Sequence, residues 1–157
     1  MVGSAAISGF LDALRNGGGW DLDRRLVARP FPQPLAGTQA NNEQWTSLRR
    51  ELARQSGIVI FLGGAKVENG KIITASGVLE EFFLARAAGA FLLPVAATGG
   101  AAREVSDQLL GSPLSASGAD AVRPTDAELR QLSDPKASVD ALAGQVFNIL
   151  KRVIKSA

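Results

Sequence analysis

Two continuous apolar runs with a helical segment between them constrain this sequence more than any other feature. The first run is "GIVIFLGG" (57–64) and the second is "AFLLPVA" (90–96). Uninterrupted apolar strands are typical of a parallel sheet that is covered on both faces. Residues 76–88 between them are expected to form a helix, and this order favours a right-handed crossover. The sequence therefore predicts an α/β fold with a mainly parallel sheet and helices on both faces.

Patterns outside this unit extend the same prediction. Amphipathic spacing indicates further helices, and a short apolar run that ends at a proline indicates one more strand, because proline has no N–H to donate. The 157 residues are expected to form one domain over 1–157. The further expected elements are helices over 4–15, 43–55, 126–132 and 139–155, a strand at 24–32, a polar loop at 33–42 and an Asn-Gly turn within 67–71.

Composition excludes several kinds of chemistry. The chain has no cysteine, histidine or tyrosine, so disulfides, thiolate or imidazole metal sites and Ser-His-Asp catalysis are impossible. No metal and no resident cofactor are expected, and any acid or base must be Asp, Glu or Lys. The net charge is only +2, and basic residues do not alternate with aromatic ones as in single-strand nucleic-acid binders.

Location follows from the same composition. No apolar run approaches the roughly 20 residues that span a bilayer, and the amino terminus lacks the basic start of a secretory signal. A chain without cysteine fits the reducing cytosol. We therefore expect a cytoplasmic protein that binds neither membrane nor nucleic acid.

The first candidate site residues follow the strand expected at 57–62. In an open parallel sheet, ligands bind outside the carboxyl ends of the strands. Gly63 and Gly64 come directly after that strand, and Lys66 follows them. Glycines let the backbone approach a ligand closely, and an ammonium group suits a phosphate. The alternative is an ordinary loop with a solvated lysine.

A second group opens the helix expected at 76–88. Ser76 is expected to cap this helix, and Gly77 leaves its first N–H groups open to an anion. Glu80 and Glu81 point about 100° apart around the helix axis, so one can face solvent while the other faces a cleft. A carboxylate there would accept hydrogen bonds from a ribose diol. Alternatively, both acids only stabilise the helix start.

The third strand exit and one helix complete the candidate set. Thr98, Gly99 and Gly100 precede another helix, whose amino terminus suits phosphate. Arg49 and Arg50 lie on the helix expected at 43–55, and either could grip a phosphate with its planar fork. An ordinary strand-to-helix turn and a solvated helix face are the alternatives. Three polar strand exits in succession indicate a nucleotide-like ligand.

Taken together, "GIVIFLGGAK", "SGVLEEF" and "LLPVAATGGAA" resemble the SLOG superfamily, the Rossmann-like domains related to LOG and DprA proteins. The likeness is closest to the STALD subgroup, the Sir2/TIR-associating SLOG domains, which include the carboxy-terminal sensor domain of the Thoeris anti-phage effector. "RPFP" and "SLRREL" support it. The resemblance implies a Rossmann-like three-layer fold. It runs from about residue 2 to residue 110.

The resemblance also implies a function. In that family the domain binds a cyclic ADP-ribose isomer made by a TIR protein, and binding reorganises a homo-oligomer and releases a linked Sir2 or other effector. The implied ligand contacts are Lys66, a glutamate of "GVLEEF" and an arginine of "SLRREL". Glu81 is preferred because the acid of the LOG motif falls four residues after the glycine that matches Gly77. Arg50 is preferred over Arg49.

Two departures keep other interpretations open. Family members begin with a strand, a helix and a second strand before a glycine-rich loop, whereas "MVGSAAISGF" matches from about that loop onward, so part of the cleft is expected to be missing. Within these 157 residues we expect no effector domain. The alternatives to a non-enzymatic sensor are a LOG-like phosphoribohydrolase and an oligomerisation module. The segment "TASGV" weakens the case for the phosphoribohydrolase, because it lacks the paired glycines of the LOG signature and has Val78 where LOG has threonine.

The oligomerisation interpretation depends on the closing helix. Its apolar residues would either cover the sheet, which we prefer, or pair with a second copy of the chain. Those residues are Val146, Ile149, Leu150 and Val153.

Overall fold

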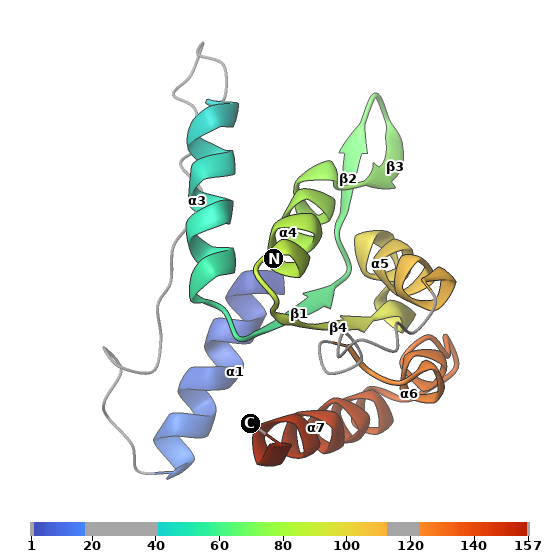
Figure 1. Cartoon of the computed structure of the whole chain (residues 1–157). Coiled ribbons are helices and arrows are strands. Elements are labelled where there is room, and N and C mark those ends of the chain that lie inside the picture. Colours follow the sequence, from blue (N-terminus) through green and yellow to red (C-terminus); the bar gives the residue numbers. More distant parts are fainter. Residues whose placement is uncertain (1, 18–40, 113–122, 157) are drawn as a thin grey trace. The chain divides into compact units, whose positions relative to one another are not determined.

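The structure, a computed structural model, describes residues 2–17, 41–112 and 123–156, in two compact units, Met1–Trp45 and Thr46–Ala157 (Figure 1). The first unit contains α1 (Val2–Gly17) and the first turn of α3 (Asn42–Gln55). Both helices confirm predicted ones. The strand predicted at 24–32 and most of the loop predicted at 33–42 lie outside the described residues.

A parallel pair of strands lies at the centre of the second unit. β1 (Ile58–Leu62) pairs with β4 (Phe91–Val95), with Ile58 opposite Phe91 and Leu62 opposite Val95. The crossover between them contains α4 (Ser76–Ala87). The predicted strand–helix–strand unit is therefore confirmed, with bounds within two residues of those expected.

Helices pack on both faces of this sheet, as predicted (Figure 1). On one face, Phe61 and Leu92 pack with Phe82 of α4 and with α5 (Gly100–Gly111). On the other face, α7 (Val139–Ser156) covers β4. The apolar residues singled out on α7 all belong to this second core or pack against it, so α7 does cover the sheet. They are Val146, Ile149, Leu150 and Val153.

The expectation that both apolar strands are covered on both faces is right for β4 and wrong for β1. Every residue of β4 is buried. In β1, Val59 and Phe61 face the core formed with α4 and α5, whereas Ile60 and Leu62 on the opposite face remain 42% and 40% exposed. Composition cannot tell these cases apart, because an apolar run has the same sequence whether one or both of its faces are covered.

A β-hairpin extends from the carboxyl end of β1 (Figure 1). β2 (Ala65–Glu68) and β3 (Lys71–Thr74) pair antiparallel. The turn residues Asn69 and Gly70 have φ of 52° and 73°, values that suit a type I′ turn and that Asn-Gly adopts readily. The predicted Asn-Gly turn is confirmed, although the sequence analysis did not anticipate the strands on either side of it.

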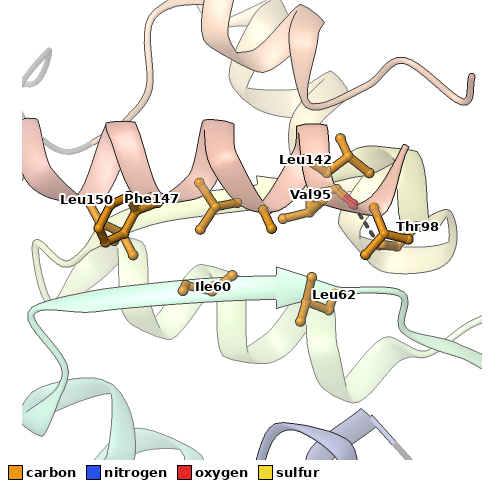
Figure 2. Close-up of a pocket in the computed structure, with 10 residues that line it drawn as sticks. Ile60, Leu62, Val95, Thr98, Leu142, Phe147 and Leu150 are labelled. Atoms are coloured by element: carbon orange, nitrogen blue, oxygen red, sulfur yellow. Dashed lines mark hydrogen bonds between the residues drawn. The ribbon is translucent and has the colours of Figure 1, made fainter. Parts of the chain in front are cut away.

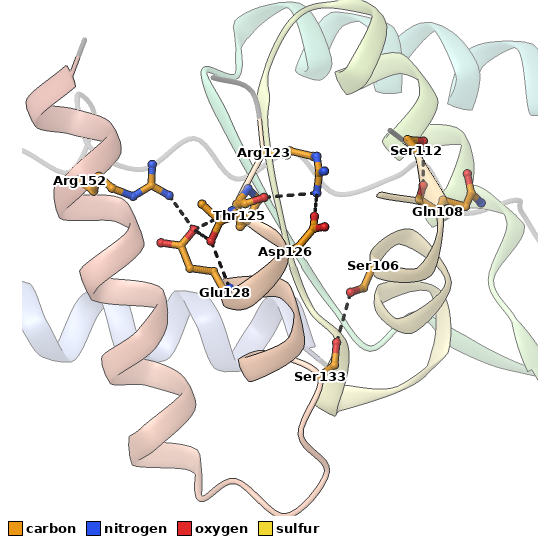
Figure 3. A network of polar contacts seen from close by, with 10 residues as sticks. Ser106, Gln108, Ser112, Arg123, Thr125, Asp126, Glu128, Ser133 and Arg152 are labelled. Atoms are coloured by element: carbon orange, nitrogen blue, oxygen red, sulfur yellow. Dashed lines mark hydrogen bonds and ion pairs between the residues drawn. The ribbon is translucent and has the colours of Figure 1, made fainter. Parts of the chain in front are cut away.

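Polar contacts fix the carboxy-terminal helices to one another. α6 (Asp126–Gln131) begins with a capping box formed by Thr125 and Glu128, and Arg152 of α7 donates to Glu128 at 2.8 Å (Figure 3). Burial disfavours the charged form of Glu128, but hydrogen bonds from Thr125 and Arg152 outweigh it and lower the pKa of this carboxyl. Within the described ranges, no helix has the length and apolarity to cross a membrane.

Candidate functional site

The carboxyl end of β1 is bonded directly to the start of α5. The carbonyl of Gly63 accepts from the N–H of Ala102 at 2.8 Å, and the carbonyl of Gly64 accepts from Ala101 at 3.1 Å. The carbonyl of Gly64 also accepts from Ala75, just before α4, at 2.8 Å. The β1 exit therefore holds the amino ends of α4 and α5 together, which is where the sequence placed the site.

The glycines at this junction permit close packing. A Cβ on Gly64 would lie 2.7 Å from the Cβ of Ala101, and one on Gly100 would lie 2.8 Å from the carbonyl oxygen of Gly63. The hydroxyl of Thr98 donates to the Val95 carbonyl at 2.6 Å.

The polar groups of this junction mostly satisfy one another. Thr98 also accepts from the N–H of Gly63 at 2.7 Å, and the N–H of Gly99 is bonded to Ala96. The structure thus brings the predicted residues Gly63, Gly64, Thr98, Gly99 and Gly100 together. The carbonyls of Gly63 and Gly64 and the N–H groups of Gly63 and Gly99 have partners within the protein, and contact of these residues with a ligand stays a prediction.

An arginine and two glutamates form the charged cluster of the site. Arg49 on α3 lies with Nη1 at 2.8 Å from Oε2 of Glu80 and with Nε at 3.5 Å from Oε1 of Glu81. Thr46, one turn earlier on α3, donates its hydroxyl to Oε1 of Glu80 at 2.5 Å. The Arg49 side chain is only 11% exposed, whereas both carboxylates are about one-third exposed. The cation of the cluster is therefore mostly buried, whereas its two carboxylates are partly accessible to solvent.

Gly77 gives the guanidinium its place against α4. A Cβ at this position would lie 2.5 Å from Nη2 of Arg49, so only glycine allows the arginine to lie against the first turn of the helix. The predicted cap by Ser76 is wrong, because Ala75 is the N-cap and no side chain bonds the helix start. Ser76 is instead the first helical residue. An N-terminus without a side-chain cap and with a guanidinium beside it favours an anion.

Burial raises the pKa of the Glu81 carboxyl. Arg49 opposes this shift, and the neighbouring charge of Glu80 adds to it. The Glu81 carboxylate is partly desolvated and lies 3.5 Å from Nε of Arg49, so it can accept hydrogen bonds that are shorter and stronger than this contact.

The other two predicted cations are more exposed. Arg50 is on the exposed side of α3, and the structure brings Arg49, not Arg50, to the glutamates. Lys66 lies on β2, where its ammonium is 3.2 Å from Glu68. Its partner in the register is Ile73, three residues before α4 begins. Lys66 therefore lies in the hairpin that connects the carboxyl end of β1 to the start of α4.

Two polar residues near the site were missed by the sequence analysis. Thr46 is three residues before Arg49 and so on the same helix face; this spacing was readable once Arg49 was considered. Glu68 is two residues after Lys66, which places both side chains on one face of a strand. That signal required the hairpin to be recognised.

A separate groove of about 480 Å³ lies between β1 and α7 (Figure 2). Among the residues that the structure describes, no charged side chain lines it, and Thr98 at one end is the one lining residue that is also a predicted site position. Its apolar walls do not suit a phosphate. The lining residues are Ile60, Leu62, Val95, Thr98, Val139, Leu142, Ala143, Val146, Phe147 and Leu150.

A parallel sheet between helical layers, with the amino ends of helices at the strand exits, defines a Rossmann-like domain. The chain belongs to the STALD family, the Sir2- and TIR-associating SLOG family, whose model matches residues 1–153. The resemblance seen in the sequence is thereby confirmed.

Curated relatives agree with this assignment. The NAD(+) hydrolase ThsA of Bacillus cereus (strain MSX-D12) is 38% identical over 104 residues, which is 66% of this chain and 21% of that protein. ThsA of Acinetobacter baumannii (strain 532279) is 35% identical over 115 residues, 69% of this chain and 24% of that protein. ThsA of Enterococcus faecium is 32% identical over 108 residues, 69% and 21%. The chain spans between a fifth and a quarter of the length of these relatives.

Proposed function

We propose that this chain is a sensor domain that binds a cyclic ADP-ribose type nucleotide at the amino end of α4. The observation that carries the proposal is the guanidinium of Arg49 held against Gly77, beside two carboxylates. In this assignment Arg49 and Lys66 bind the pyrophosphate. Glu81 accepts hydrogen bonds from ribose hydroxyls.

Binding without turnover fits the chemistry of the cluster better than hydrolysis. The segment "TASGV" lacks the paired glycines and the threonine of the LOG signature. Glu80 has each carboxylate oxygen engaged, by Thr46 and by Arg49, which leaves Glu81 as the acid open to a ligand. A LOG-like phosphoribohydrolase, with Glu81 as its acid or base, remains the second candidate because burial raises the pKa of this carboxyl.

The role in a larger assembly is part of the same proposal. The relatives are named NAD(+) hydrolases, and the family is described as associating with Sir2 and TIR proteins. We propose that nucleotide binding to this domain regulates a linked or partner Sir2-type effector that consumes NAD. The setting would be Thoeris-like anti-phage defence in the cytoplasm, with the domain acting in a homo-oligomer.

The test is titration calorimetry of the chain with a panel of cyclic ADP-ribose isomers, followed by mass spectrometry of the recovered ligand. We expect micromolar or tighter binding of at least one isomer, recovered intact. Arg49→Ala and Lys66→Ala should each weaken binding about 10- to 100-fold, as expected for a lost hydrogen bond to a charged group. Arg54→Ala, on the exposed side of the same helix, is the matched control and should bind normally.

Two outcomes contradict the proposal. Failure of every isomer to bind a folded chain rejects the sensor assignment. Release of a free base from a nucleoside monophosphate, abolished in Glu81→Gln, supports the phosphoribohydrolase instead.

A further inference from the structure

We propose that Glu80 and Thr46 are positioning residues that hold Arg49 in the orientation in which it meets the ligand, and that Glu80 does not itself contact the ligand. This inference rests on the proposed function of the Arg49 site. It divides the adjacent acids of "LEEF" between two roles. Glu80 fixes the cation, and Glu81 is left to the nucleotide.

The two oxygens of Glu80 are used inside the protein. Oε2 accepts from Nη1 of Arg49 at 2.8 Å, and Oε1 accepts from the hydroxyl of Thr46 at 2.5 Å. Thr46 and Arg49 are three residues apart on α3 and therefore lie on one helix face. A single carboxylate on α4 thus bonds to two successive positions of that face. Such a short, charge-assisted arrangement defines where the guanidinium plane lies.

Three sides of the Arg49 guanidinium are defined by different groups. Glu80 is bonded to Nη1, Glu81 lies 3.5 Å from Nε, and the backbone at Gly77 lies against Nη2. The contact with Glu81 is the long one, so Glu81 can turn to a ligand while the bond with Glu80 keeps the arginine in place. Without Glu80, the flexible arginine stem would sample many rotamers, and binding would have to order it.

The first test needs no ligand. NMR of the ¹⁵N-labelled chain measures rotation of the Arg49 guanidinium about its Cζ–N bonds, with the resonance assigned from Arg49→Lys. We expect slow rotation in the wild type and rotation about tenfold faster in Glu80→Gln, as for loss of one charged hydrogen bond. Glu43→Gln, an exposed glutamate on the same helix, should change nothing. Unchanged rotation in Glu80→Gln would overturn the inference.

The second test uses the cyclic ADP-ribose isomer that binds the wild type most tightly. Glu80→Gln should weaken its binding about tenfold, and Thr46→Val about threefold. Thr46→Ser, which restores the hydroxyl, should recover the affinity, and Ser47→Ala is the control for the adjacent exposed hydroxyl. In an Arg49→Ala background, Glu80→Gln should have no further effect, because the residue that it positions is absent.

The outcomes separate this inference from the proposed function. If Glu80→Gln weakens binding equally with and without Arg49, Glu80 contacts the ligand and the inference is wrong, while the sensor assignment stands. If the wild type binds no isomer, the sensor assignment fails, and the rotation measurement alone decides whether Glu80 positions Arg49. Thermal melts of every variant show which of them are folded.

Discussion

Replacing Gly77 with alanine should separate the function of the site from the stability of the fold. The new Cβ would lie 2.5 Å from Nη2 and 3.2 Å from Cζ of Arg49. The guanidinium is the mobile end of a long side chain, so it would move away and lose its 2.8 Å bond with Glu80. That loss is about 1.5 kcal/mol, the low end for charged hydrogen bonds because Glu80 is partly exposed. Because Gly77 lies in the first turn of α4 and not in the helix interior, alanine recovers only about 0.5 kcal/mol over glycine there. The net cost is therefore about 1 kcal/mol.

Two further glycine substitutions calibrate this result in urea unfolding experiments. Gly144→Ala in α7, where nothing lies within 4 Å of the new Cβ, should stabilise the chain by about 1 kcal/mol. Gly100→Ala places its Cβ 2.8 Å from the Gly63 carbonyl at φ +57°, and should cost about 3 kcal/mol. Gly77→Ala should stay folded and bind the cyclic nucleotide about tenfold more weakly. Wild-type affinity in Gly77→Ala would show that ligand binding does not depend on the position of the Arg49 guanidinium against α4.

Three more predictions concern pH and packing. Burial raises the pKa of Glu81 above its ordinary 4.5, so the folded chain keeps the Glu81 proton to a higher pH than the unfolded chain does. The free energy of unfolding should therefore fall as pH rises from about 4.5 through the raised pKa. Glu81→Gln should remove this pH dependence from urea unfolding curves measured over a pH series. The pKa of Glu128 is lowered in the folded chain, so its contribution to the free energy of unfolding should be present above about pH 4.5 and be lost as pH falls through the folded pKa. Glu128→Gln should therefore cost about 1 kcal/mol at pH 7 and nothing in strong acid. An equal cost at both pH values would contradict this prediction. Leu93→Ala, at a fully buried position, should cost about 3 kcal/mol, whereas Leu62→Ala, 40% exposed beside the groove, should cost about 1 kcal/mol; equal losses would mean that the groove is filled in solution.

Much of the fold was predictable because its elements depend on local signals. The spacing of apolar residues and the turn residues predicted the bounds of β1, α4, β4 and α7 to within two residues. Asn69 and Gly70 marked their turn because few other residues adopt positive φ there. The partial exposure of Ile60 and Leu62 depends on which residues lie across the sheet, and no local pattern records that.

The candidate site was predictable as a neighbourhood but not in its contacts. The rule that ligands bind at strand exits predicted that Gly63, Gly64, Gly99 and Gly100 would lie near one another, and the structure places them together. The choice between Arg49 and Arg50 depends on a rotation of about 100° around α3, and the sequence alone could not fix that rotation. The contact between Gly77 and Arg49 was missed for a similar reason. The need for glycine at this position is visible only when the neighbouring guanidinium is known.

We propose that the nucleotide binds at the Arg49 cluster, and NMR titration of the Arg49 Nε–H resonance is the test of this assignment. On addition of the cyclic ADP-ribose isomers, we expect a saturable shift of this resonance for at least one isomer, with the ligand recovered intact. The shift should be lost in Glu81→Gln. Saturable shifts confined to the methyl groups of Ile60 and Leu62, with the Arg49 resonance unchanged, would place binding in the apolar groove and rule out the Arg49 cluster as the binding site.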